Sequence, residues 1–302
     1  MSELGPRWRA SDFDPEVLHV FDQYVHGDID RREFLARVGR LALGTLTAAG
    51  LLGALSPRFA EAQQVGPGDE RIDARYVEYD SPRGHGRGRG YLVRPARAAR
   101  KLPPVVLVVH ENRGLNPHIE DVARRLALEN FVALAPDALF PLGGYPGDED
   151  QARTLFQTLD QTKCFEDFVA ATQFLRAQPG VRDRLGVVGF CYGGAIANRL
   201  ALALPDLAVA VPFYGGAPPL DQVSDIKASL LLHFAEHDER VNAAWPAYEA
   251  ALKAARVRYT AHVYPGTQHG FHNDTTPRFD EKAAKLAWRR TLALFNRRLR
   301  RG

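Results

Sequence analysis

Short runs of apolar and β-branched residues, separated by amphipathic helical patterns, follow one another through most of the chain. The run Pro104–Val109 contains no polar residue, which is typical of a strand buried on both faces of a sheet. Other strands are expected at residues 75–79, 90–94, 131–135, 185–188, 208–213, 230–235 and 259–264. Helical patterns occupy residues 119–129, about 150–178, 194–203, 242–255 and 278–298. Strands that recur with helices between them require crossover connections, so we expect a mostly parallel sheet with helices on both faces.

Residues 63–302 contain no internal repeat, and we expect them to form a single α/β domain. In open sheets of this kind, the functional site lies at the carboxyl ends of the strands. The residues that directly follow the expected strands are therefore the candidates for chemistry.

The N-terminal segment has a different composition. Arg31 and Arg32 precede Phe-Leu and then a stretch, residues 38–55, that contains no acidic residue and a single base, Arg40. This order is typical of a twin-arginine export signal, and residues 59–62 offer a small-x-small cleavage pattern. We therefore expect residues 1–62 to be a leader and the protein to be periplasmic or otherwise exported. The alternatives are an amphipathic helix packed on the domain and a cytoplasmic protein.

The weakly charged stretch is short for a membrane span, which needs about 20 apolar residues. Membrane association is therefore expected only through an uncleaved leader. Lys and Arg total 39 against 36 Asp and Glu, and this formal charge of +3 is too weak to indicate a nucleic-acid partner. The basic end of the C-terminal helix is expected to be solvated.

No cofactor is expected, because the chain has neither a glycine-rich dinucleotide loop nor a Walker lysine motif. No metal is expected either. His233 and His237 are four residues apart, but they span a strand end and would face different ways. Cys164 lies in a helical pattern and is expected to be a half-buried core thiol.

Two glycine-rich segments lie outside these elements. The Gly-Arg alternation at residues 84–90 is expected to form a turn. Residues 143–147 are expected to form a plain connecting loop, the alternative being a loop that lines or covers a pocket.

The candidate nucleophile is Cys191. The strand at residues 185–188 is followed by Gly-Phe-Cys-Tyr-Gly-Gly and then by a helical pattern, which is the strand-turn-helix setting of a nucleophile elbow. Glycines flank such a residue because side chains two positions away would collide in the sharp turn. The start of a helix also favours the thiolate form of a cysteine. The alternative is a buried cysteine in a tight packing turn.

A nucleophile of this kind needs a base and a residue to orient it. Asp238 follows one later strand and His269 follows the next, which reproduces the chain order nucleophile, acid, base. Asp238 has an alternative role as a helix N-cap or turn residue, with Glu239 as a competing acid. His269 has an alternative as a surface loop histidine, with His272 as competitor.

The first buried strand is followed by His-Glu-Asn-Arg-Gly at residues 110–114. A loop at this position donates one amide to an oxyanion hole, and the residue after the nucleophile donates the other. The expected donors are the backbone N–H groups of Asn112 and Tyr192. Glu111 would then lie close to the thiol, the alternative being a surface glutamate paired with Arg113.

Together these segments resemble the dienelactone hydrolase (carboxymethylenebutenolidase) family of α/β-hydrolases. The resemblance covers roughly residues 75–298 and rests on four pieces: Gly-Phe-Cys-Tyr-Gly-Gly at 189–194, His-Glu-Asn-Arg-Gly at 110–114, Asp238, and Gly-Thr-Gln-His-Gly-Phe at 266–271. It implies a catalytic triad of Cys191, His269 and Asp238. It also implies that Glu111 helps to deprotonate the cysteine when substrate arrives, and that Tyr192 and Asn112 form the oxyanion hole.

One position departs from the family. The member that acts on dienelactone carries an arginine four residues after the histidine, where it holds the substrate's carboxylate, whereas this chain has Asn273. Arg113 and Arg240 are the candidate replacements. The reaction class survives this change, but dienelactone as the natural substrate does not follow from the resemblance.

The resulting hypothesis is a hydrolase of a small carboxylic ester or lactone that works through a thioester acyl-enzyme. The alternative is a non-catalytic protein that binds small molecules on the same fold and has a redox-sensitive Cys191. The sequence makes no prediction about the oligomeric state.

Overall fold

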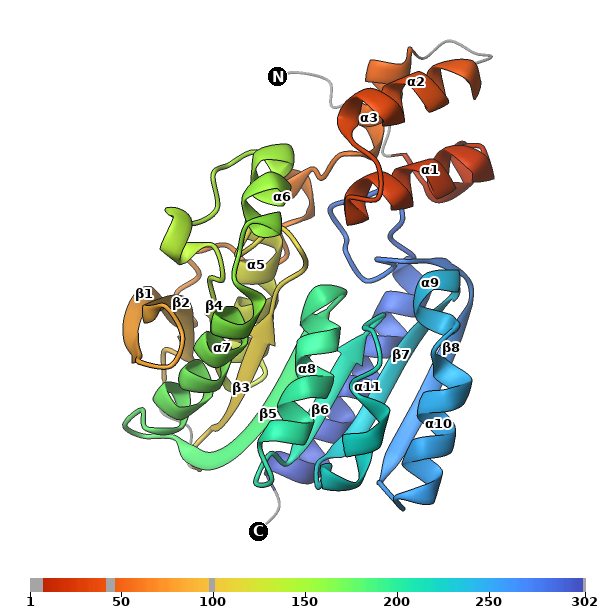
Figure 1. Cartoon of the computed structure of the whole chain (residues 1–302). Helices are drawn as coiled ribbons and strands as arrows, with labels where there is room; N and C mark the ends of the chain where they lie inside the picture. The colour runs from red at the N-terminus through yellow and green to blue at the C-terminus, as the bar shows by residue number, and fades with distance from the viewer. Residues whose placement is uncertain (1–7, 42–46, 98–100, 301–302) are drawn as a thin grey trace.

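The structure, a computed structural model of the chain, describes residues 8–41, 47–97 and 101–300 (Figure 1). It contains an eight-stranded sheet in the order β1-β2-β4-β3-β5-β6-β7-β8. The strands are β1 (Ile72–Ser81), β2 (Gly86–Pro95), β3 (Pro104–Val109), β4 (Val132–Pro136), β5 (Arg182–Phe190), β6 (Val209–Phe213), β7 (Ser229–His237) and β8 (Tyr259–Gln268). The β1-β2 and β2-β4 pairs are antiparallel, and the other neighbours are parallel. The mostly parallel α/β sheet is therefore confirmed.

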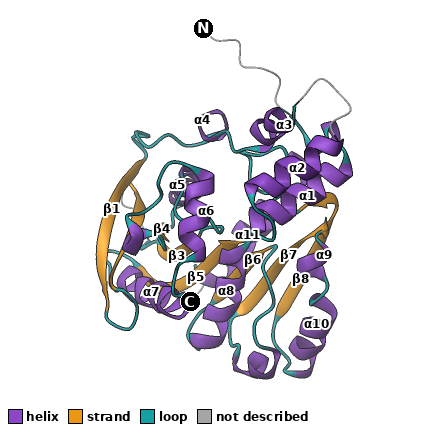
Figure 2. Ribbon diagram, turned by 45° about the horizontal axis from the view of Figure 1, so that its top comes forward, coloured by secondary structure: helices purple, strands orange, loops and turns teal. Residues whose placement is uncertain are grey.

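Helices cover both faces of this sheet (Figure 2). One apolar layer contains residues of α7 (Gln161–Arg176), α8 (Tyr192–Ala203) and α10 (Trp245–Ala254). The layer on the opposite face contains residues of α5 (Pro117–Leu128) and α11 (Glu281–Leu299). Because β3 is buried on both sides between these layers, it can consist entirely of apolar residues.

Two expected helices are each divided in the structure. The pattern at residues 150–178 forms α6 (Glu149–Gln157) and α7, because the Asp160 carboxylate accepts hydrogen bonds from the backbone of Thr162 and Lys163 and starts a new helix. The pattern at 242–255 forms α9 (Glu239–Asn242) and α10, which has a proline in its first turn.

Two smaller expectations were wrong. Residues 86–90 of the Gly-Arg segment belong to β2 rather than to a turn, because the missing side chain of Gly88 leaves room for the Tyr79 ring. A Cβ atom on Gly88 would lie 2.4 Å from that ring. Cys164 is fully buried rather than half-buried, since α7 packs this face against the sheet.

The N-terminal segment forms α1 (Pro15–His26), α2 (Arg31–Leu41), α3 (Ala48–Leu55) and α4 (Phe59–Ala62). Helices α1 to α3 gather at one end of the molecule, at the top of Figure 1, and share a hydrophobic cluster that includes Phe21, Phe34 and Leu55. Helices packed on the domain were the alternative to a leader. Residues 1–7 and 42–46 of the expected leader lie outside the described residues, and export stays a prediction.

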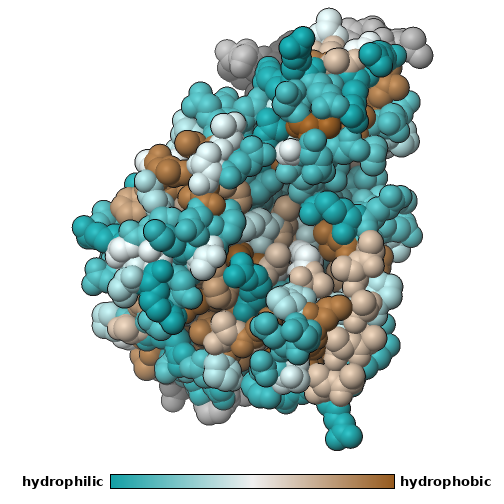
Figure 3. Space-filling model, viewed as in Figure 1, coloured by the Kyte–Doolittle hydropathy of each residue, from teal (hydrophilic) through white to brown (hydrophobic). Residues whose placement is uncertain are grey.

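Three short 3-10 helices complete the described elements: η1 (Ala10–Asp12), η2 (Phe140–Leu142) and η3 (Leu220–Asp225). Among the described residues, no helix combines the length and the apolar character that a membrane span requires. On the face drawn in Figure 3, hydrophilic residues cover much of the surface and apolar residues occur in patches between them.

Candidate active site

Cys191 lies in the turn between β5 and α8, with the unusual backbone angles φ 53° and ψ −112°. The flanking glycines make this turn possible, as expected. A Cβ atom on Gly189 would lie 1.9 Å from the carbonyl oxygen of Gly193, and one on Gly193 would lie 2.2 Å from that of Val109. No real side chain fits at these distances, so the glycines allow the strand and the helix to meet at the cysteine.

His269 and Asp238 form a buried pair beside this turn. The Nδ1 atom of His269 lies 2.6 Å from an Asp238 carboxylate oxygen, and both side chains are almost completely buried. Asp238 also caps α9 by accepting a hydrogen bond from the Val241 N–H, so the capping role and the pairing role coexist. The competing residues lie elsewhere: Glu239 is exposed, and the His272 ring stacks on Phe190.

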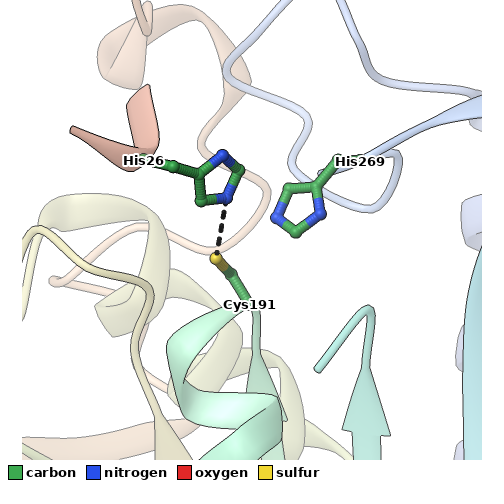
Figure 4. Close-up of side chains that lie close together, drawn as sticks. All are labelled: His26, Cys191 and His269. Carbon is green, nitrogen blue, oxygen red and sulfur yellow. Dashed lines mark hydrogen bonds between the residues drawn. The ribbon is translucent and has the colours of Figure 1, made fainter. Parts of the chain in front are cut away.

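The Cys191 thiol faces two histidines (Figure 4). Its sulfur lies 3.6 Å from Nε2 of His26, and ring nitrogens of His26 and His269 and the sulfur all lie within 4.8 Å of one another. Burial alone would raise the pKa of Cys191, but the charges of His269 and His26 and their hydrogen bonds lower it to about 5. Burial would lower the pKa of His269, yet Cys191 and Asp238 raise it to about 10.

These opposite shifts favour a thiolate-imidazolium pair over the neutral pH range. His26 was absent from the sequence-based site. Its spacing from Asp22 is that of any amphipathic helix, and nothing in the local sequence places the end of this helix above the sheet.

The two expected oxyanion donors line the same site. Tyr192 is the first residue of α8, so its backbone N–H has no acceptor within the helix and is available to a ligand. Asn112 lies beside the cysteine in the loop after β3, and its side-chain amide donates to the carbonyl oxygen of Val25 at 2.9 Å. That bond ties the loop after β3 to helix α1.

Glu111 does not pair with Arg113, so the surface-pair alternative was wrong. Its Oε2 atom accepts a hydrogen bond of 3.1 Å from the side-chain amide of Asn273. Arg113 is buried instead, with Nε 3.7 Å from a Glu149 carboxylate oxygen and Nη1 donating to the Asn112 side chain at 2.7 Å. The buried loop after β3 thus separates these two charged groups, although they follow each other closely in sequence.

Arg240, the second candidate for holding a carboxylate, lies at the other side of the thiol. Its Nη2 atom is 2.7 Å from Nε2 of His26. Arg240 is therefore engaged with the same imidazole that faces the sulfur.

Two cavities reach Cys191. One has a volume of about 320 Å³ and is lined by the acidic and basic side chains of Glu111 and Arg113 and by apolar residues of α1 and α3. Tyr145 and Gly147 also line it, so the expectation of a plain connecting loop at residues 143–147 was wrong. The other cavity, of about 390 Å³, is bordered by Arg240.

Within the described part of the chain, His26, Cys191 and His269 form a group whose atoms are close enough to hold a metal ion. The same atoms are the candidate nucleophile and its imidazole partners. His233, in contrast, is buried away from this group and contacts Tyr264 and Thr291 through its two ring nitrogens.

A mostly parallel sheet with a cysteine in a strained strand-to-helix turn, and an acid and a histidine after later strands, is the arrangement of an α/β-hydrolase. The model of the dienelactone hydrolase family matches residues 89–299, and the chain belongs to this family. It is a hydrolase of carboxylic esters or lactones. Residues 5–41 match a separate family model, described as YqhI-like.

Relatives and solved structures agree with this family. A Synechocystis protein named "Putative carboxymethylenebutenolidase" is 30% identical over 229 residues, covering 70% of this chain and 92% of that protein. The Escherichia coli "Putative hydrolase fragment YghX" is 56% identical over 117 residues, covering 39% of this chain and 99% of the fragment.

A crystal structure of a "Putative Dienelactone Hydrolase" from Klebsiella pneumoniae is 30% identical, with a TM-score of 0.65. The similarity covers 74% of this chain and 98% of that structure. About a quarter of this chain therefore has no counterpart in it.

Proposed function

We propose that the chain hydrolyses a small carboxylic ester or lactone with Cys191 as nucleophile, His269 as acid and base, and Asp238 as the residue that orients His269. The buried 2.6 Å contact between His269 and Asp238, next to the cysteine of a strained elbow, carries this proposal. A buried aspartate that accepts from Nδ1 leaves Nε2 of the imidazole for the reacting groups. The Nε2 atom of His269 is buried and is not used by Asp238, which leaves it for the Cys191 sulfur and the substrate.

The reaction follows from these positions. The Cys191 thiolate attacks the carbonyl carbon, and the negative charge on oxygen is stabilised by the backbone N–H groups of Tyr192 and Asn112. The His269 imidazolium gives its proton to the leaving alkoxide, which leaves a thioester on the sulfur. Neutral His269 then takes a proton from water, whose oxygen attacks the thioester, and the carboxylic acid and thiolate are released.

Glu111 is proposed to influence the thiol's proton when substrate arrives. It borders the same cavity as Cys191 and is held by Asn273. A carboxylate near the sulfur opposes the stabilisation of the thiolate by His269 and His26, which leaves the sulfur anion more reactive toward the carbonyl carbon.

A substrate that carries a carboxylate would meet Arg113 rather than the family's arginine. Arg113 borders the cavity, and its Nε atom has no hydrogen-bond partner among the described residues although Glu149 lies nearby. Arg240 is less suited, since it already contacts His26. A Bradyrhizobium relative, 33% identical over 216 residues, is named "Probable 2-oxo-3-(5-oxofuran-2-ylidene)propanoate lactonase", which supports a lactone as one substrate class.

The test is hydrolysis of an aryl acetate and of a dienelactone, side by side, by the wild type and by Cys191→Ala. We expect turnover of the aryl acetate that Cys191→Ala abolishes. Turnover of dienelactone as well would mean that another group binds the substrate's carboxylate in place of the missing arginine, and Arg113 is the first candidate. Activity retained by purified Cys191→Ala would show that Cys191 is not the nucleophile.

Export through the twin-arginine-like segment is a separate hypothesis. It is supported by the order of arginines, apolar stretch and small residues in the sequence. N-terminal sequencing of the protein from its native host, with fractionation of the periplasm, measures both location and cleavage.

A further inference from the structure

Helix α1 ends directly over the active site. His26 is its last residue, and Gly27 stops the helix in the left-handed conformation, with φ 86°. The His26 imidazole reaches to 3.6 Å from the Cys191 sulfur (Figure 4). This helix belongs to the segment that precedes the matched dienelactone hydrolase region, which begins at residue 89.

The His26 ring is held in place from both sides. Its Nδ1 atom lies 2.8 Å from the backbone oxygen of Asp22, one turn earlier, and 3.3 Å from the Asp22 carboxylate. Asp22 is in turn contacted by Arg278 at 3.4 Å. The ring of His269 meets His26 edge-on, with ring centroids 4.7 Å apart.

The Nε2 atom of His26 has two neighbours, the Cys191 sulfur and the Arg240 guanidinium. When the imidazole is neutral, Nε2 accepts a hydrogen bond from Arg240. When the imidazole is protonated, Nε2–H donates to the sulfur. In the neutral state the positive charge lies on Arg240, which contacts the ring that faces the sulfur, and in the protonated state it lies on His26 itself.

The rest of the segment is anchored to the hydrolase domain. Arg153 Nη1 donates to the backbone oxygen of Tyr24 at 2.5 Å, and Arg31 forms a 2.8 Å ion pair with Asp150. The Asn112 side chain, from the loop after β3, donates to the backbone oxygen of Val25. These contacts fix the end of α1 relative to the catalytic residues and make the segment one wall of the cavity.

We propose that the N-terminal helical segment completes the active site of this hydrolase, with His26 acting as a second imidazole that holds the Cys191 thiolate. The proposal rests on Cys191 being the nucleophile. It gives the two histidines different tasks. His269 must transfer its proton to the leaving oxygen, whereas His26 keeps its protons and stabilises the sulfur anion before attack and again when the thioester breaks.

The electrostatic surroundings of His26 support these different tasks for the two histidines. Burial lowers the pKa of His26, but hydrogen bonds to Asp22 and Cys191 outweigh burial and leave it raised. The charged and titratable groups around the two side chains are Asp22 on α1, Arg240 on α9, Glu111 and Arg113 after β3, Tyr214 after β6 and His269 after β8, with Arg278 behind Asp22. Removing His26 takes away one of the contacts that lower the pKa of the thiol.

The proposal also requires that the segment stay attached to the working enzyme. Cleavage after residue 62 would remove His26 and the apolar side chains of Phe21, Leu52 and Leu55, which line the cavity beside Cys191. An exported enzyme would therefore keep this segment.

The test compares full-length His26→Asn with His19→Asn, an exposed histidine on the same helix. The rate of Cys191 alkylation by iodoacetamide is followed over about pH 4 to 9. Loss of one hydrogen bond to a charged group costs roughly 1.5–3 kcal/mol, so the midpoint of the profile should rise by about one pH unit or more in His26→Asn. His19→Asn should match the wild type.

Turnover gives a second readout. For an aryl acetate, kcat should fall at least about tenfold in His26→Asn with a smaller change in KM, because the lost contact is to the reacting sulfur. Added imidazole should restore part of the activity of His26→Gly, which a purely structural role would not allow. If His26→Asn does not fold, Asp22→Asn replaces it and should shift the midpoint in the same direction.

An alkylation midpoint and a kcat that stay at wild-type values in folded His26→Asn would overturn the proposal. The alkylation profile requires no turnover. Failure of this proposal is therefore distinguishable from failure of the proposed hydrolysis, in which Cys191→Ala would retain wild-type activity.

Discussion

The side-chain amide of Asn273 donates a hydrogen bond to the carboxylate of Glu111 across 3.1 Å. The carbonyl oxygen of the Asn273 side chain is engaged as well, since it accepts from the backbone and the hydroxyl of Thr275. Asn273 is thus a fixed, neutral partner of Glu111 at the position where the dienelactone enzyme has an arginine. Glu111 therefore meets a neutral hydrogen-bond donor, and no cation, at this position.

Glu111→Gln should slow acylation at neutral pH more than it weakens substrate binding. The glutamine keeps the size of the side chain and offers an oxygen to Asn273, but it carries no negative charge to act on the sulfur. Single-turnover kinetics with an aryl acetate separate the acylation rate from binding. Glu239→Gln, the same change at an exposed position, is the control. Equal acylation rates in Glu111→Gln and wild type would refute this role.

Asp238→Asn should lower kcat by roughly 10²–10⁴-fold while the protein stays folded. Asparagine caps a helix as well as aspartate does, so α9 keeps its hydrogen bond from Val241. The amide, however, neither fixes the tautomer of His269 nor stabilises its positive charge, and loss of the aspartate in a serine triad costs roughly 10⁴-fold. Activity and thermal unfolding are measured together. Near-normal kcat in a folded variant would exclude Asp238 as the orienting residue.

The two cysteines should differ sharply in reactivity. The pKa of Cys191 is lowered to about 5, whereas burial raises that of Cys164 to about 11 despite a contact with Tyr192. Since thiolate is the reactive form above the pKa, Cys191 should react at neutral pH and lose reactivity as the pH falls below about 5. Peptide mapping after brief iodoacetamide treatment locates the label. Comparable labelling of Cys164 in the folded protein would contradict these shifts.

The sheet and the elbow were predictable because their signals are local. A strand buried on both faces must be apolar throughout, as Pro104–Val109 is, and the elbow needs Gly189 and Gly193 within two residues of Cys191. The loops of Asp238 and His269 follow from the parallel sheet, which brings strand ends to one edge. None of these inferences requires knowledge of how distant segments pack.

The parts that escaped prediction depend on packing between distant segments. His26 meets Cys191 across 165 residues of sequence, and Asn273 meets Glu111 across 162. The amphipathic pattern of helix α1 does not specify the surface on which the helix packs. The breaks before α7 and α10 also lie inside continuous helical patterns, where a single cap or proline decides the boundary.

A close backbone contact in the elbow yields the last prediction, that Gly193→Ala destabilises the protein and abolishes activity. The added Cβ atom would lie 2.2 Å from the carbonyl oxygen of Val109 and 2.7 Å from that of His110. Both obstacles are backbone atoms, so α8 must move away from β3 and carry Cys191 with it. The free energy of unfolding should fall by about 3 kcal/mol or more, which is above the usual cost of overpacking. Gly216→Ala is the matched control, because its Cβ atom would meet only the Ala195 Cβ at an ordinary 3.9 Å. Urea unfolding of both variants measures the difference, and equal stability of Gly193→Ala and wild type would mean that the elbow is less tightly packed than described.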